Sequence, residues 1–227
     1  LQGGIKAAEK YRDLSQPVPD DGRFLRLSDG MAFGESESQG ITRGNKFYHK
    51  SLNLFVEFPT GWKVQNTQSV LGAISPDGSQ IIKMQMDSIA PPIDPSSYLS
   101  SKFQSVSEVQ NVSTSEDQAF AGIATTQDPK TGQQQRYRVS TVTRGGQAFI
   151  MTGLGKTELP DQTFFDTTKS VRKLKSSEIA LAEGRNIKLV TARAGDTIAS
   201  LAKSSNLDKY AEAQIRLLND LYPRGEP

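Results

Sequence analysis

The stretch that most constrains the fold is an alternating segment that leads to the only tryptophan of the chain. Residues 52–58 place apolar side chains at every second position, and Pro59-Thr60-Gly61-Trp62 follows directly. A period of two is typical of a β-strand with one buried face, and Pro and Gly are typical of turns. The segment therefore predicts a strand at 52–58, and we expect Trp62 to fill the end of a core rather than to stack on a ligand.

More strands and two helices are predicted downstream of this segment. The expected strands are 70–74, 81–86, 118–126, 135–143 and 147–151, the last two joined at Gly145-Gly146. Asp94-Pro95 predicts a helix start, since Asp caps a helix and Pro suits its first position. The stripe of that helix is Leu99, Phe103 and Val106; a second helix, at 161–171, turns Phe164, Thr168 and Val171 inward. This order predicts an α+β domain at 47–175, an antiparallel sheet flanked by helices.

The two ends of the chain have a different character. Residues 1–46 are predicted to hold a weak helix at 2–14 and then a Gly-rich connector from an upstream domain, with a loop that cradles an anion as the alternative. Residues 176–185 are polar and predict a linker. Residues 186–227 predict a small module with a strand at 187–191, a helix after Thr197 and a helix at 209–218.

Composition excludes several classes of function. The chain has 227 residues, a net charge of +2, one histidine and no cysteine. A disulfide scaffold, a thiolate metal site and a zinc site built on several imidazoles are therefore excluded within it. The weak charge gives no reason to expect nucleic acid as a partner. No apolar run is long enough for a transmembrane helix, and because the sequence starts at Leu1 we expect a fragment of a longer protein.

Few residues qualify as catalytic or ligand-binding groups. His49 lies beside a strand and is expected to pack or to form a hydrogen bond, because no carboxylate spacing suggests a metal site. Serine is frequent, but no base is placed to activate a hydroxyl. Four cations could form a basic patch or a solvated strand face, and we favour the latter: Lys102, Arg136, Arg138 and Arg144. The sequence therefore predicts no catalytic and no metal-binding residue.

A set of short motifs carries a family resemblance over about residues 20–221. The motifs are Asp29-Gly30-Met31-x-Phe33-Gly34-x-Ser36, Gln39-Gly40-Ile41-x-Arg43-Gly44, Phe47-x-His49 and Phe58-Pro59-x-Gly61-Trp62-x-x-x-Asn66. This text resembles the carboxy-terminal region of secreted bacterial HExxH zinc metallopeptidases of the BepA/HtpX-like type (peptidase family M-forty-eight).

The resemblance implies a non-catalytic regulatory or docking region of a periplasmic or outer-membrane-associated metalloprotease. Zinc would be bound in an upstream catalytic domain, since HExxH is absent here. The implied partners are that catalytic domain and envelope proteins.

Two finer resemblances concern the separate domains. The sheet domain is similar to PsbP-like domains, which mostly bind other proteins, and the end of the chain looks like a LysM module that lacks its last strand. The LysM resemblance places Gly195, Asp196, Thr197 and Asn219 near a glycan, so peptidoglycan becomes a candidate partner. The same polar residues are also typical helix caps and turn formers. The alternative function is therefore a peptidoglycan-binding or protein-interaction adaptor without protease activity.

Overall fold

A computed structural model describes residues 23–67, 70–89, 93–103, 105–114, 116–127, 131–155, 160–205, 207 and 210–227. The chain forms two compact units. The larger unit is residues 32–185, and the smaller unit combines residues 1–31 with 186–227. The helix expected at 2–14 lies outside the described residues.

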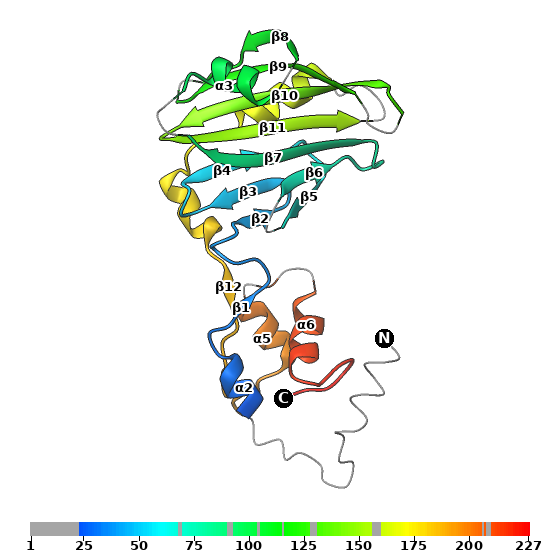
Figure 1. The fold of residues 1–227 in the computed structure, drawn as a ribbon. Helices are drawn as coiled ribbons and strands as arrows, with labels where there is room; N and C mark the ends of the chain where they lie inside the picture. The colour runs from blue at the N-terminus through cyan, green and yellow to red at the C-terminus, as the bar shows by residue number, and fades with distance from the viewer. Residues whose placement is uncertain are drawn as a thin grey trace, which may run out of the picture. The chain divides into compact units, whose positions relative to one another are not determined.

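A seven-stranded antiparallel sheet forms the centre of the larger unit (Figure 1). Its strand order is β5-β6-β7-β11-β10-β9-β8. The strands are β5 (Lys63–Asn66), β6 (Leu71–Ile74), β7 (Gln80–Ser88), β8 (Val106–Asn111), β9 (Gln118–Gln127), β10 (Gln134–Arg144) and β11 (Gln147–Gly155). The turn between β10 and β11 contains Gly145 and Gly146, both with positive φ, as the sequence predicts for a tight hairpin.

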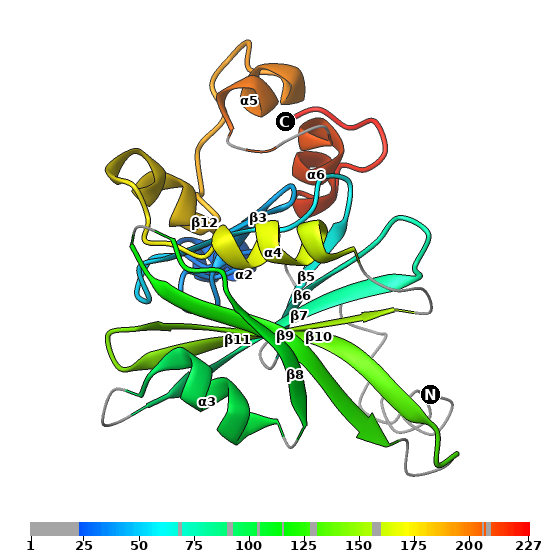
Figure 2. The same ribbon diagram turned by 90° about the horizontal axis from the view of Figure 1, so that it is seen from above.

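Additional elements cover both faces of this sheet. Figure 2 shows α4 (Asp161–Lys169) on one side of it and α3 (Pro95–Lys102) on the other. On the α4 side lies a second, three-stranded antiparallel sheet made of β2 (Ile41–Arg43), β3 (Lys46–His49) and β4 (Leu54–Glu57). The predicted α+β class with an antiparallel sheet is confirmed, but the sequence did not predict the second sheet.

The main core lies between the two sheets and α4. Met84 faces Met151 across the β7–β11 pair, and both side chains are buried. Phe58, Phe149 and Phe164 are the largest side chains buried there. A smaller apolar cluster lies under α3 on the opposite face and contains Leu99, Ala124 and Val139. The large sheet thus has buried side chains on both of its faces. Every second side chain of a strand points to the same side, so neighbouring residues of one strand contribute to the two different clusters.

The α3 region confirms one predicted feature and corrects another. Asp94 caps α3 as expected, with its Oδ2 accepting from Ser97 N at 2.8 Å. Phe103 is the C-cap, with an extended backbone at φ −122°, and Val106 begins β8. Val106 is therefore not part of a helical stripe, although Phe103 and Val106 do pack against the cluster below α3.

The segment at 176–185 is not a linker. Residues Ser176–Ala182 form a 3₁₀ helix, η1, and buried Ala182 packs with Tyr48 and Phe55 of the three-stranded sheet. Residues 32–46 also belong to the larger unit, which makes the domain wider than the predicted 47–175. The reason is that the short strands β1 (Ala32–Phe33) and β12 (Arg185–Asn186) pair near the two ends of this unit.

The smaller unit contains α2 (Arg23–Ser28), α5 (Ile198–Ser204) and α6 (Ala211–Leu218). The two predicted helices of the end module are present, but the expected strand at 187–191 is not. Instead, Ile187 exchanges backbone hydrogen bonds with Gly30 and Met31, and Leu189 N donates to Asp29 Oδ1 at 2.7 Å. Within the described ranges, none of the helices has the length and apolar character needed to cross a membrane.

Candidate functional site

The Gly-rich connector closes on itself through one carboxylate and one amide. Glu35 accepts hydrogen bonds from Thr42 N at 2.5 Å and from Thr42 Oγ1 at 2.7 Å. Asn66 Nδ2 donates to Glu35 Oε1 at 3.3 Å and to the carbonyls of Gln39 and Gly40, both at 3.0 Å. The motif residues before and after β3–β4 therefore meet. The loop therefore holds the carboxylate of Glu35 itself, and Glu35 has a structural role.

Gly40 has a steric reason to be glycine. Its φ is +84°, and a Cβ at this position would lie 2.3 Å from the Phe47 ring. Both the left-handed backbone and the close ring exclude a larger residue. The spacing Gly40-x6-Phe47 in the motif thus reflects packing between the connector and β3.

Trp62 lies at the margin of the main core. Gly61 has φ +82°, and Trp62 N donates to Pro59 O at 3.1 Å, which closes the turn after β4. The Trp62 side chain is only partly buried and packs against the main core cluster. It covers the end of the core, as predicted, but it is not enclosed by it.

His49 has a structural environment. Its Nδ1 accepts a hydrogen bond from Leu52 N at 3.4 Å, and its ring lies edge-on to Phe47. Partial burial lowers the pKa of His49, which favours the neutral imidazole. Among the residues that the structure describes, no group of three His, Cys, Asp or Glu side chains is arranged to hold a metal ion.

The four cations considered as a basic patch all have acidic neighbours. The pairs are Lys102–Asp87 at 2.6 Å, Arg136–Glu108 at 2.9 Å, Arg138–Asp161, and Arg144–Asp117 at 3.2 Å. The pair of Arg144 and Asp117 is the most enclosed, and burial raises the pKa of Asp117 while Arg144 opposes that shift. These four side chains therefore do not form a patch of unpaired positive charge.

The residues expected near a glycan make local hydrogen bonds in the smaller unit. Gly195 has φ +92°, and Asp196 Oδ2 accepts from Arg193 N at 2.7 Å. Thr197 caps α5 by accepting from Ser200 N at 3.1 Å, and Asn219 Nδ2 donates to Ile215 O at 2.8 Å at the end of α6. Each has the cap or turn role that the sequence offered as the alternative. Their contact with a glycan stays a prediction.

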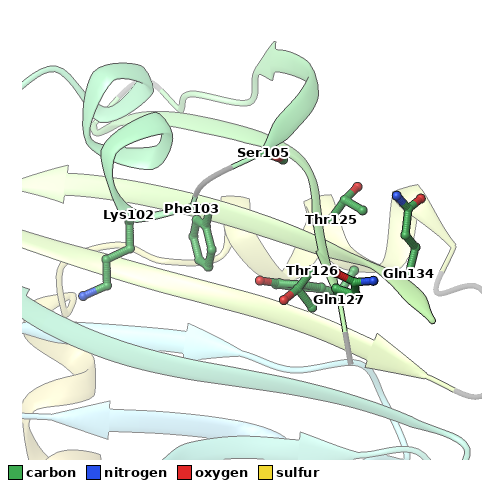
Figure 3. Close-up of a pocket in the computed structure, with 8 residues that line it drawn as sticks. Lys102, Phe103, Ser105, Thr125, Thr126, Gln127 and Gln134 are labelled. Carbon is green, nitrogen blue, oxygen red and sulfur yellow. The ribbon is translucent and has the colours of Figure 1, made fainter. Parts of the chain in front are cut away.

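A polar pocket of about 430 Å³ lies where α3, β9 and β10 meet. It is lined by Lys102, Phe103, Ser105, Thr125, Thr126, Gln127, Gln134 and Tyr137 (Figure 3). Figure 3 shows Lys102 extending away from Thr125, Thr126 and Gln134. The rings of Phe103 and Tyr137 meet edge to face, with centroids 6.1 Å apart. Sequence reasoning missed this pocket because no local pattern joins its three segments.

A second open pocket of about 570 Å³ lies between α5 and α6 in the smaller unit. Its wall is formed by small residues such as Ala199 and Ala202 together with Tyr210 and Arg216. Tyr210 is largely exposed, whereas Arg216 is held by Glu212 and Glu226. Among the described residues of its lining, there is neither a pair of convergent carboxylates nor a nucleophile with a base.

Comparison with known proteins assigns no family. The sequence matches no family model and no curated protein. Among solved structures, one match is a crystal structure at 1.50 Å of a protein from Bacteroides thetaiotaomicron, with a TM-score of 0.45 and 13% identity. The match covers 60% of this chain and 51% of the other, so the matched region spans about half of that neighbour.

Proposed function

We propose that this chain is a non-catalytic docking and regulatory region of a periplasmic zinc-dependent metalloendopeptidase. The observation that carries the proposal is the contact of Asn66 with Gln39 and Gly40, through hydrogen bonds from Asn66 Nδ2 to both carbonyls. These residues come from separate parts of the motif, and they interact directly. The motif residues that resemble a protease family therefore contact one another in the fold. This supports the proposal, because a connector shared with that family would keep the residues that hold it together.

The finer architecture belongs to the same proposal. The helix-flanked antiparallel sheet and the turn at Gly61-Trp62 support a PsbP-like domain, whose usual role would be to bind proteins. The capped helices α5 and α6 support a LysM-like module, in an altered form because residues 187–191 build no strand. In this scheme the upstream domain binds zinc and cleaves the substrate. The chain itself docks that domain onto envelope proteins.

Two measurements test the proposal. The reading frame ahead of Leu1 should encode HExxH, and its absence would overturn the assignment to a protease. The purified 227-residue chain should not cleave labelled casein with or without added zinc. Chelator-sensitive cleavage by the chain alone would show that it is catalytic.

A matched pair of glycine variants tests the docking role in the full-length protease. Gly40→Ala introduces a methyl group against Phe47, whereas at Gly34, which also has positive φ, a Cβ meets nothing within 4 Å. We expect Gly40→Ala to slow cleavage of a folded protein substrate more than Gly34→Ala, while cleavage of a short peptide is unchanged. Equal effects of the two variants would show that the packing of the connector against Phe47 has no role in docking.

A peptidoglycan-binding adaptor is the second candidate, favoured by the exposed loop 191–195 before α5. Retention of the chain on insoluble peptidoglycan tests it. Asp196→Asn is the suitable variant, since Asn keeps an oxygen that can accept from Arg193 N. Retention that Asp196→Asn abolishes would support glycan binding by this loop. No retention of the unaltered chain would leave the module a structural end-piece.

A further inference from the structure

The polar pocket beside α3 runs along the edge of the large sheet. Three consecutive residues of β9 line it, namely Thr125, Thr126 and Gln127. Successive side chains of a strand point to opposite faces of the sheet. A pocket that touches all three therefore lies against the edge of β9 rather than on one face.

The edge is open because β9 extends further than its neighbour β8. Thr125 N donates to Ser105 O at 3.0 Å, just before β8 begins at Val106. Backbone groups of alternate residues point to the same side of an antiparallel strand, so Gln127 directs its N–H and C=O toward this edge. The chain on that side has turned into α3, where Phe103 N donates to Leu99 O at 3.2 Å. Within the described residues, no strand therefore lies beside Gln127.

The rest of this edge is less suited to an added strand. The register of β8 against β9 shifts between Ser107 and Gln110, and Glu108 has φ +53°. A bulge of this kind bends the outer edge and interrupts its row of backbone donors and acceptors. By contrast, β9 pairs with β10 in unbroken register from Gln118 to Gln127, so this end of β9 is not bent by a bulge.

The pocket lining favours an uncharged ligand. The charge of Lys102 is matched by Asp87 at 2.6 Å, and burial raises the pKa of Tyr137, which keeps its phenol neutral. The other polar groups are hydroxyls and amides, which both donate and accept hydrogen bonds. Such a lining satisfies a polypeptide backbone with small polar side chains.

We propose that the edge of β9 at Gln127 binds an extended, uncharged polypeptide segment as a short added strand. The segment continues the line of β8: Ser105–Thr125 is the last internal contact, and the Gln127 N–H and C=O form the next one with the ligand. Its side chains alternate between Thr126 and Tyr137 on the α3 face and Gln134 on the opposite face. The proposal does not require the chain to belong to a protease.

The test uses one defined probe, the blocked peptide acetyl-Thr-Gln-Thr-Val-Thr-Gln-Thr-Val-Thr-amide with a fluorescent label. Its anisotropy should rise on titration with the intact 227-residue chain. The same peptide with every backbone amide N-methylated has no N–H to donate on either edge, cannot add as a strand and should not bind. In the unaltered chain, peptide binding should shift the Gln127 amide resonance and slow its hydrogen exchange more than at residues outside the pocket.

Two substitutions of Gln127 distinguish the contribution of its backbone N–H to peptide binding from that of its side chain. Gln127→Ala and Gln127→Pro both remove the side-chain hydrogen bond to Gly132 O, but only Pro removes the N–H. Proline is tolerated where the N–H faces away from the sheet, so both variants should fold. We expect Gln127→Pro to weaken peptide binding about three- to tenfold relative to Gln127→Ala, the effect of one hydrogen bond.

Three results would overturn the proposal. The first is no binding and no Gln127 shift in the unaltered chain at about millimolar peptide, the weak end of specific affinity. The second is equal binding by the methylated and unmethylated peptides. The third is perturbation of this pocket by the N-acetylglucosamine tetramer and not by the peptide, which would identify a saccharide site. If Gln127→Pro does not fold, the resonance measurement on the unaltered chain still decides.

Discussion

The two units of the chain differ in how they bury apolar side chains. The main core cluster of the larger unit contains fifteen buried hydrophobic residues from both sheets and α4. In the described part of the smaller unit, Ile198 is the one buried hydrophobic residue. Among the residues that the structure describes, thirteen large hydrophobic side chains are exposed, and eight of them belong to the smaller unit: Leu27, Met31, Leu189, Val190, Tyr210, Leu217, Leu218 and Tyr222.

Polar contacts hold the described helices of the smaller unit. Glu226 Oε2 accepts from Ile198 N at 2.8 Å at the start of α5, and Glu226 Oε1 pairs with Arg216 of α6 at 2.7 Å. Thr197 and Ser200 cap α5 reciprocally. Exposed ion pairs contribute little to stability and are screened by salt.

This contrast has a direct thermodynamic meaning. The larger unit gains its stability from area removed from water, so its fold should survive changes of salt. The smaller unit has few buried contacts and should open locally before the larger one unfolds. Its exposed apolar residues also make it the better candidate for further burial against a partner.

The largest expected effect is the loss of a central core side chain. Phe149 on β11 is fully buried, so Phe149→Ala should lower the free energy of unfolding by about 3–5 kcal/mol. Leu217→Ala, which truncates an exposed residue of α6, should change it by less than about 0.5 kcal/mol. Urea unfolding followed by the fluorescence of Trp62 measures the effect of Phe149→Ala. Because Leu217 lies in the smaller unit, hydrogen exchange at the amides of α6 measures the effect of Leu217→Ala. Similar losses in the two variants would remove the contrast between the units.

The ion pair between Arg172 and Glu178 should make the larger unit sensitive to acid. Glu178 accepts bonds from both guanidinium nitrogens of Arg172, at 2.7 and 2.8 Å, and this partner lowers the pKa of Glu178 to about 2. A lowered pKa stabilises the fold above the ordinary value of 4.5, and the contribution is lost as pH falls toward 2.

Glu178→Gln should therefore cost about 2 kcal/mol at pH 7, and the difference from the unaltered chain should shrink at low pH. Urea unfolding at pH 7, 4 and 2.5 provides the measurement. A difference that is constant across these pH values would contradict the assigned role, because only ionised Glu178 has the two charge-assisted bonds.

Trp62 should have an intermediate effect because it covers the core without being enclosed by it. From the sequence, Trp62→Ala would cost about 3–5 kcal/mol if the ring were fully buried. With the side chain only partly buried, we expect about 1–2 kcal/mol, less than for Phe149→Ala. Thermal unfolding followed by circular dichroism measures this, since the variant has no tryptophan. An unchanged melting temperature together with loss of a partner would show that Trp62 is a binding residue.

A region could be predicted from the sequence when the residues that determine its structure are close together in the chain. The β10–β11 hairpin is set by alternation and two adjacent glycines, and the start of α3 by Asp94-Pro95, so both were predicted. The second sheet was missed because β2 and β3 are only 3 and 4 residues long and depend on Glu35 and Asn66, which are distant in sequence.

The segment 176–185 was predicted to be a linker because its residues are polar. In the structure the polar side chain of Glu178 forms an ion pair with Arg172 instead of marking a solvated linker. The pocket at Gln127 could not be predicted either. It exists because β9 continues for three residues beyond Ala124, the partner of the first residue of β8, and no residue type encodes this overhang.

The smallest expected effect concerns the link between α5 and the end of the chain. The backbone N–H of Ile198 and then Arg216 lower the pKa of Glu226, so the ionised carboxylate is the form that joins the two. Glu226→Gln should speed hydrogen exchange at the Ile198 amide without changing exchange at Phe149 in the core. The difference should diminish in high salt, because the contacts of Glu226 are exposed. Faster exchange throughout the larger unit would show that the two units share one cooperative transition, which the contrast between their cores does not predict.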